Sequence, residues 1–462
     1  MTLRIAKSFG ASILLIVLLG VVLSAQQPSK KELKRAEDLI RQAEKAFKAK
    51  DYKTSVEKYA EALIILPKNA SAHFWKGYAH YYRKEFDLAA KELTLAQELG
   101  YSAIEVAKVR WIVNYQLGNH DDALRDIESA LSFSPDDPAL LRAAGDIYYE
   151  KKRYKEALAA FERAALRTPD DGDLYFAIAQ IQFLLGDVRG QEAAAEVAVS
   201  KPGRFPGEAR LLLADAYRKQ RKYEQAVLMY EQALSSQPNN KEIYRAMADI
   251  YRIQGLFEKA IEITKRALRI WPIDGDLFTD ISWYYSLAGQ HENAVQAALS
   301  ATKLLPDRPL GYTNLCRAYN DLGQWQNSIN SCNKALLLSP NDGETNFYLG
   351  RAYQQLGRQG EATKAYDRAV AGLLKFTQEN PEYSDGYYLL GNAYFAINQL
   401  EKALEAYRKC LDLAPKFSRA LYNSGVVYIR LRNKQAALTQ YSRLLPLDKD
   451  LAEKLKAAID NM

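Results

Sequence analysis

The stretch YKEALAAFERAALRTP, residues 154–169, returns in closely similar form as YEQAVLMYEQALSSQP at residues 223–238. In both stretches the alanines, one aromatic residue and the final proline stand at the same spacing, and apolar residues recur every three or four positions, which is typical of an amphipathic helix. Related copies return about every 34 residues along nearly the whole chain. Self-similarity at such a period is typical of stacked helical repeats, so the sequence predicts an all-α fold.

Each repeat is predicted to be a helical hairpin, because apolar residues follow helical spacing twice per period. Small residues such as Gly145 and Ala157 belong where the two helix axes come closest, and an aromatic residue such as Phe161 fills the space beside them. Proline followed by Asp or Asn separates the repeats, as in SPDDP at 134–138 and SPNDGE at 339–344. Such segments end one helix and cap the next.

The register predicts about twelve units over residues 36–447, after a polar linker at 26–35 and before a capping helix at 448–462. The predicted units start near residues 36, 70, 104, 138, 172, 207, 241, 275, 309, 343, 384 and 418. Two units depart from the pattern. The fifth has Gln191 and Ala195 where an alanine and an aromatic residue are expected, which predicts a loose or bent second helix. The tenth has extra residues near 371–385, interpreted either as a longer second helix or as a functional insertion.

The repeat resembles the tetratricopeptide repeat, whose second-helix signature is carried by residues 154–169 and 223–238, and whose full signature is carried by GNAYFAINQLEKALEAYRKCLDLAP at 391–415. The resemblance covers nearly the whole chain after its first 25 residues. It implies a right-handed superhelical solenoid in which the first helices line a concave groove and the second helices face outward. A single hairpin cannot bury its apolar face, whereas stacked hairpins can.

The first 25 residues differ in composition from the rest. Arg4 and Lys7 precede the uncharged apolar stretch 11–23, and Ser24-Ala25 comes before a polar segment. This order predicts a secretory signal peptide or a short membrane tether through residues 9–25, and hence an exported or membrane-tethered protein. The basic residues near Lys30 support a second interpretation, an uncleaved anchor with the repeats in the cytoplasm.

Composition and charge narrow the class of partner. The net charge of +7 is small for 462 residues and no basic run with interleaved aromatic residues occurs, so nucleic acid is not an expected partner. The four histidines are scattered, and no phosphate-binding loop or CxxC pair is present. We therefore expect no catalytic residues, no metal and no cofactor, and we expect other proteins or peptides as partners.

The cysteines leave two interpretations open. Cys316 and Cys332 fall where the two helices of the ninth unit should pack, so a disulfide between them fits the predicted geometry. Alternatively both are small buried apolar residues, as the alanine-like position of Cys410 favours.

Candidate groove residues come from comparing the same position in successive units. At the twelfth position of the first helix, counted from Ala36, stand five aromatic residues: Phe47, Tyr81, Tyr115, Tyr149 and Phe183. An aromatic column of this kind is suited to binding an extended or helical peptide. The alternative is structural packing in place of a missing tyrosine in the first three units. Tyr149 does not fit that alternative, because Tyr148 already holds the structural position.

Two further sets complete the candidates. The same column continues with Arg218 and Arg252, which predicts either a basic stretch of groove or local ion pairs with Asp215 and Asp249. At the ninth position of later units stand Arg317, Arg351 and Asn392, which are suited to holding a carboxylate or a peptide backbone.

These observations favour a non-enzymatic scaffold that binds polypeptide segments outside the cytoplasm, in envelope assembly or secretion. The alternative is a membrane-anchored regulatory adaptor with cytoplasmic repeats. A more remote alternative is an accessory protein of a carbohydrate pathway.

Overall fold

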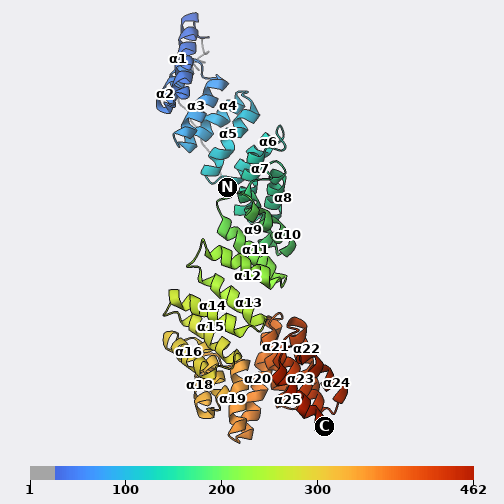
Figure 1. The fold of residues 1–462 in the computed structure, drawn as a ribbon. Helices are drawn as coiled ribbons and strands as arrows, with labels where there is room; N and C mark the ends of the chain where they lie inside the picture. Colours follow the sequence, from blue (N-terminus) through green and yellow to red (C-terminus); the bar gives the residue numbers. More distant parts are fainter. Residues whose placement is uncertain (1–26) are drawn as a thin grey trace, which may run out of the picture. The chain divides into compact units, whose positions relative to one another are not determined.

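The computed structural model describes residues 27–462, and the predicted leader at 1–25 lies outside the described residues. The described part of the chain consists of helices joined by short turns and contains no strand, which confirms the all-α prediction (Figure 1). It falls into two compact units, one ending at Leu185 and the other beginning at Gly186.

The first unit is a stack of antiparallel hairpins. Its helices are α1 (Lys30–Lys48), α2 (Tyr52–Ile65), α3 (Ala70–Tyr82), α4 (Phe86–Glu98), α5 (Ala103–Gln116), α6 (His120–Leu131), α7 (Pro138–Glu150), α8 (Tyr154–Ala165) and α9 (Gly172–Leu185). Helix α1 begins within the predicted linker because Ser29 caps it. The Ser29 hydroxyl accepts from the Glu32 N–H, and the Glu32 carboxylate accepts from the Ser29 N–H, which together form a capping box.

The second unit continues the same pattern over more hairpins. Its helices are α10 (Val188–Ser200), α11 (Pro206–Lys219), α12 (Tyr223–Leu234), α13 (Lys241–Ile253), α14 (Phe257–Ile270), α15 (Gly275–Leu287), α16 (His291–Leu304), α17 (Pro309–Asp321), α18 (Trp325–Leu338), α19 (Gly343–Gln355), α20 (Gln359–Glu379), α21 (Ser384–Ala396), α22 (Leu400–Leu413), α23 (Ser418–Arg430), α24 (Lys434–Leu444) and α25 (Lys449–Asp460). Helix α25 buries Ala452, Leu455 and Ile459 against the last hairpin.

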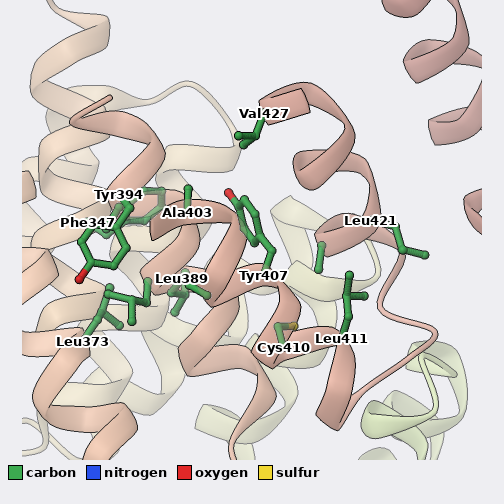
Figure 2. Packing of buried hydrophobic residues seen from close by; sticks show 14 of the residues in the cluster. Phe347, Leu373, Leu389, Tyr394, Ala403, Tyr407, Cys410, Leu411, Leu421 and Val427 are labelled. Atoms are coloured by element: carbon green, nitrogen blue, oxygen red, sulfur yellow. The ribbon is translucent and has the colours of Figure 1, made fainter. Parts of the chain in front are cut away.

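Small residues and aromatic rings pack together as the repeat predicted. A Cβ atom on Gly145 would lie 2.5 Å from Cε1 of Phe161, and one on Gly391 would lie 2.4 Å from Cε1 of Tyr407. The ring therefore packs directly on the glycine and leaves no room for a Cβ atom, so any side chain at these positions would displace the ring. Figure 2 shows Tyr407 within the buried cluster of the second unit, close to Cys410 and Leu411.

The predictions for the two atypical units have different outcomes. The extra residues of the tenth unit extend α20 to 21 residues, so the prediction of a longer second helix is confirmed. The second helix of the fifth unit is not loose as one form of the prediction had it, because α10 is continuous over 13 residues. Gln191 is fully buried there, and its Nε2 donates to the Leu212 carbonyl at 2.7 Å, which ties α10 to α11.

Candidate binding site

The second unit contains a cavity of about 480 Å³. Most of its lining comes from first helices of consecutive hairpins: Trp283 from α15, Arg317 from α17, Arg351 from α19, Asn392 from α21 and Arg430 from α23. First helices thus surround the cavity, as the resemblance implied for a groove. The volume lies within the range of small-ligand sites, about 300–1,000 Å³.

One wall of the cavity depends on a contact between hairpins far apart in the sequence. Arg252 of α13 donates through Nη1 to Asp385 of α21 at 2.5 Å, across 133 positions, and through Nε to Asp249 at 2.9 Å. The side chains of Arg252 and Asp385 are only 6% and 12% exposed. We call the Arg252–Asp385 pair the clasp. A second link is made by Arg419 of α23, whose Nη2 donates to the Leu287 carbonyl at 3.0 Å.

Aromatic rings surround the clasp. The guanidinium of Arg252 lies 4.6 Å from the centre of the Trp283 ring and 5.6 Å from that of Tyr383. Burial disfavours the charged form of Arg252, but the charges of Asp385 and Asp249 outweigh it and raise the pKa of Arg252 above its ordinary value. Burial also raises the pKa of the Tyr383 hydroxyl. Arg252 is therefore charged at any physiological pH, and the clasp serves as a fixed structural link.

Inside the cavity the polar groups are unequally satisfied. Arg317 donates through Nη2 to Glu344, while its Nη1 is buried and has no hydrogen-bond partner in the described part of the chain. The buried hydroxyl of Ser286 is likewise unpaired there. Arg351 is 41% exposed, and its Nη1 lies 3.6 Å from Asp321, too far for a hydrogen bond. Buried polar groups are normally paired, so unpaired ones beside a cavity indicate a site for a ligand or for ordered water.

The ninth-position candidates come together at this cavity. Arg317, Arg351 and Asn392 all line it, and the Asn392 Oδ1 atom accepts from the Tyr407 hydroxyl at 2.7 Å and from Asn423 at 2.8 Å. Sequence reasoning missed Trp283, which occupies the same ninth position one repeat earlier. Extending the column by one unit would have found it.

The aromatic column of the first unit has a structural role at the hairpin turns. Its first four members each approach the ring five positions later, at the start of the second helix of the same hairpin. The ring centroids are 5.4 Å apart for Phe47–Tyr52, 6.4 Å for Tyr81–Phe86, 5.6 Å for Tyr115–His120 and 5.8 Å for Tyr149–Tyr154. The contacts agree with the packing alternative. They do not test binding, which stays a prediction.

Exposure within this column increases along the unit. Phe47, Tyr81 and Tyr115 are half-buried, whereas Tyr149 and Phe183 are 38% and 43% exposed. The Tyr115 hydroxyl donates to Glu150 at 2.7 Å, and this hydrogen bond raises the pKa of Tyr115 to about 12. Tyr149 and Phe183 are therefore the members of the column best placed to contact a partner.

Arg218 and Arg252 both form the local ion pairs that the sequence left open. Arg218 Nη2 lies 2.9 Å from Asp215 Oδ1, and Arg252 Nη2 lies 2.9 Å from Asp249 Oδ1. Arg252 is moreover buried in the clasp, so its guanidinium is not available as part of a basic groove surface. Arg252 is buried because Asp385 of α21 contacts it, and the repeat register does not predict this contact between distant helices.

Comparisons with known proteins agree with the geometry. Models described as tetratricopeptide repeat match residues 34–102, 115–186, 211–274, 344–371 and 384–417, together more than half of the chain. The chain belongs to the tetratricopeptide repeat family. Its repeats thus account for both the hairpin stack and the series of first helices around the cavity.

Curated relatives match the repeats over short stretches. The chain is 34% identical over 112 residues to serine/threonine-protein phosphatase 5 of Rattus norvegicus, covering 24% of this chain and 22% of that protein. It is 32% identical over 130 residues to small glutamine-rich tetratricopeptide repeat-containing protein 2 of Saccharomyces cerevisiae, covering 27% of this chain and 36% of that protein. The matched stretch thus spans only 22% and 36% of the length of these two relatives.

Among solved structures, the fold is similar to the crystal structure of the APC/C hetero-tetramer Cut9-Hcn1. The TM-score is 0.40 and the identity 15%, with 94% of this chain and 98% of that chain covered. It is also similar to the structure of Naa15/Naa10 bound to HypK-THB, with a TM-score of 0.44, 15% identity, and coverage of 88% of this chain and 68% of that chain.

The ninth tetratricopeptide repeat contains a disulfide. The structure joins Cys316 of α17 to Cys332 of α18, and the Cα atoms of the two residues are 5.1 Å apart, within the range that a disulfide spans. Cys410 is a buried thiol in α22. Burial raises the pKa of that thiol above its ordinary value, so it is not an activated nucleophile.

The histidines of the repeats each lie beside one carboxylate. The pairs are His73–Glu92, His80–Glu85, His120–Glu150 and His291–Asp321. Within residues 27–462, no group of three or more His, Cys, Asp or Glu side chains is placed to hold a metal ion. No helix within the same range is both long and apolar enough to cross a bilayer.

Proposed function

We propose that this tetratricopeptide repeat protein is a scaffold that holds polypeptide segments of other proteins. The observation that carries the proposal is the cavity of the second unit, where five first helices present aromatic and charged side chains to one space. A folded repeat array exposes such faces repeatedly, and extended binding surfaces are how repeat proteins recognise partners. In the first unit, Tyr149 and Phe183 offer exposed rings for the same purpose.

We further propose that the scaffold works outside the cytoplasm, in envelope assembly or secretion. Two observations support this place. The charged and apolar order of residues 1–25, followed by a polar segment, is typical of a secretory leader. A disulfide between Cys316 and Cys332 persists in an oxidising compartment and is rare in a reducing one. The alternative function, a membrane-anchored adaptor with cytoplasmic repeats, is favoured by the lysines near Lys30.

Crosslinking in living cells tests both parts of the proposal. A photoreactive residue is placed at Tyr149, at Arg351, or at Glu162 on the exposed face of α8 as a control. Mass spectrometry then identifies the captured proteins and the N-terminal peptide. We expect specific proteins at Tyr149 or Arg351, none at Glu162, and a chain that begins at Gln26.

Two results would contradict the proposal. Capture confined to Glu162 would place the partner on the opposite face of the repeats and would favour the adaptor. An intact Met1 peptide, together with unreacted thiols at Cys316 and Cys332, would contradict the exported location.

A further inference from the structure

The charged groups around the cavity of the second unit are not equally engaged. Its carboxylates are mostly held by the protein: Asp342 accepts from the Thr345 N–H at 2.8 Å, Glu344 accepts from Arg317, and Asp385 accepts from Arg252. Its arginines keep unused donors. Arg351 makes only a long ion pair, and Arg430 Nη1 lies 3.5 Å from Asn398 Oδ1, at the limit of a weak hydrogen bond.

The formal charges of the lining balance. The lining contains the arginines 317, 351, 419 and 430 and the carboxylates of residues 321, 342, 344 and 385. Arg252, which lies behind the wall, is shared between Asp385 and Asp249 and adds no free charge. What favours an anion is therefore the pair of unused donor groups, Arg317 Nη1 and Arg351, which together suffice for one carboxylate. Guanidinium groups bind planar carboxylates through paired N–H donors.

The apolar part of the lining is aromatic. Trp283, Tyr348 and Phe417 contribute rings to the cavity, and Leu373 and Phe376 come from the extended end of α20. Arg317 already lies between two of these rings, 5.8 Å from the Trp283 centroid and 5.6 Å from that of Tyr348. Flat apolar walls beside a guanidinium favour a ligand with a planar ring close to its charge.

From these observations we infer that the cavity is a discrete site for an aromatic carboxylate, with the carboxylate on Arg351 beside Arg317 and the ring against Trp283 and Tyr348. If the carboxylate is the C-terminus of a partner polypeptide, the inference rests on the proposed scaffold function and specifies its ligand. If the ligand is a free molecule, the site has a binding function of its own. Both sources present the same chemistry to the cavity.

Titration calorimetry at pH 7 on the chain that begins at Gln26, residues 26–462, tests the inference. The probes are N-acetyl-L-phenylalanine and its amide, and the peptide acetyl-Gly-Gly-Phe with a free or an amidated end. We expect the free acid to bind at least about ten-fold more tightly than the amide, because a charge-assisted hydrogen bond is lost in the amide. If the peptide acid binds, the C-terminus of a polypeptide can supply the carboxylate. If only the small acid binds, the ligand is a free molecule.

Two variants locate the site. Arg351→Met should remove the preference for the acid, whereas Arg368→Met, an exposed residue of α20 that does not line the cavity, should keep it. Circular dichroism should show the same helix content in both, because both side chains are solvent-exposed. Equal binding of acid and amide, no binding of either, or an acid preference that survives in Arg351→Met would overturn the inference. Crosslinking at Tyr149 would be unaffected by such a failure, so the scaffold proposal is tested separately.

Discussion

The two units use the same register position in different ways. In the first four hairpins of the first unit, the twelfth position of the first helix holds an aromatic ring that packs against the start of the second helix of the same hairpin, as Tyr115 does with His120. In the second unit the same position varies in size and polarity, and Ser286, Gln354 and Phe395 at this position line the cavity. A uniform aromatic column thus packs each hairpin of the first unit on itself, whereas a varied column leaves side chains free to line a shared cavity in the second.

The units also differ in how far their stabilising contacts reach. Hairpins of the first unit contact their neighbours, as expected for a repeat array whose stability is a sum of local terms. The second unit adds the clasp, which links α13 to α21 across 133 positions. Such a long-range link should make the second unit unfold more cooperatively than the first.

The largest expected effect comes from removing the ring that packs against a glycine in each unit. Phe161→Ala in the first unit and Tyr407→Ala in the second should each lower the free energy of unfolding by about 3–5 kcal/mol, because each leaves a large cavity against a glycine. Hydrogen exchange should show the loss of protection confined to the hairpins around Phe161. In the Tyr407 variant, the loss of protection should spread from α21 to α13. Equally local losses in both variants would contradict the prediction that the second unit unfolds more cooperatively than the first.

A smaller effect is expected from breaking the clasp. Arg252→Met leaves Asp385 buried without its partner and should lower the free energy of unfolding of the second unit by about 3 kcal/mol, at the lower end of the usual range because water can reach the pair once it opens. Arg218→Met is the matched control, since Arg218 makes the same local pair with an aspartate but is 38% exposed. It should cost less than about 1 kcal/mol.

The double variant Arg252→Met with Asp385→Leu separates charge burial from the link itself. Because the only carboxylate left without its partner is Asp249, whose side chain is 40% exposed, the double variant should regain most of the stability lost in Arg252→Met. Denaturant unfolding followed by tryptophan fluorescence would measure all three variants. If the double variant is no more stable than Arg252→Met, the clasp does not act through its charges.

The sequence predicted the contacts within a repeat and between neighbouring repeats, and it missed the contacts between distant repeats. The period and the small residues at positions such as Gly145 predicted the hairpins, because helix contacts within a repeat are encoded locally. The column of Arg317 and Arg351 was visible in the register. The clasp was not, because nothing in the repeat pattern indicates that Arg252 meets a residue in α21.

Reducing agent should affect the two units differently, since all three cysteines lie in the second unit. Opening the Cys316–Cys332 disulfide frees a short loop of the unfolded chain and should lower the free energy of unfolding by roughly 2–3 kcal/mol in the second unit alone. Alkylation of the unfolded, unreduced chain should label only Cys410. Three labelled thiols, or an equal loss of stability in a fragment ending at residue 185, would be incompatible with this assignment.

The smallest expected effect concerns the hairpin turns, where both units place one residue at positive φ. Glycine holds this place at Gly118 and Gly289, with φ of 76° and 74°, whereas Lys152 adopts a φ of 59°. A side chain is strained in this region, so Lys152→Gly should raise the free energy of unfolding by roughly 1 kcal/mol. A Cβ atom at Gly118 or Gly289 would meet nothing within 4 Å, so Gly118→Ala and Gly289→Ala should cost a similar amount through the backbone alone. Thermal unfolding of the three variants measures the effect, and similar values for the two alanine variants would show that the turn, unlike the inner face, has the same energetics in both units.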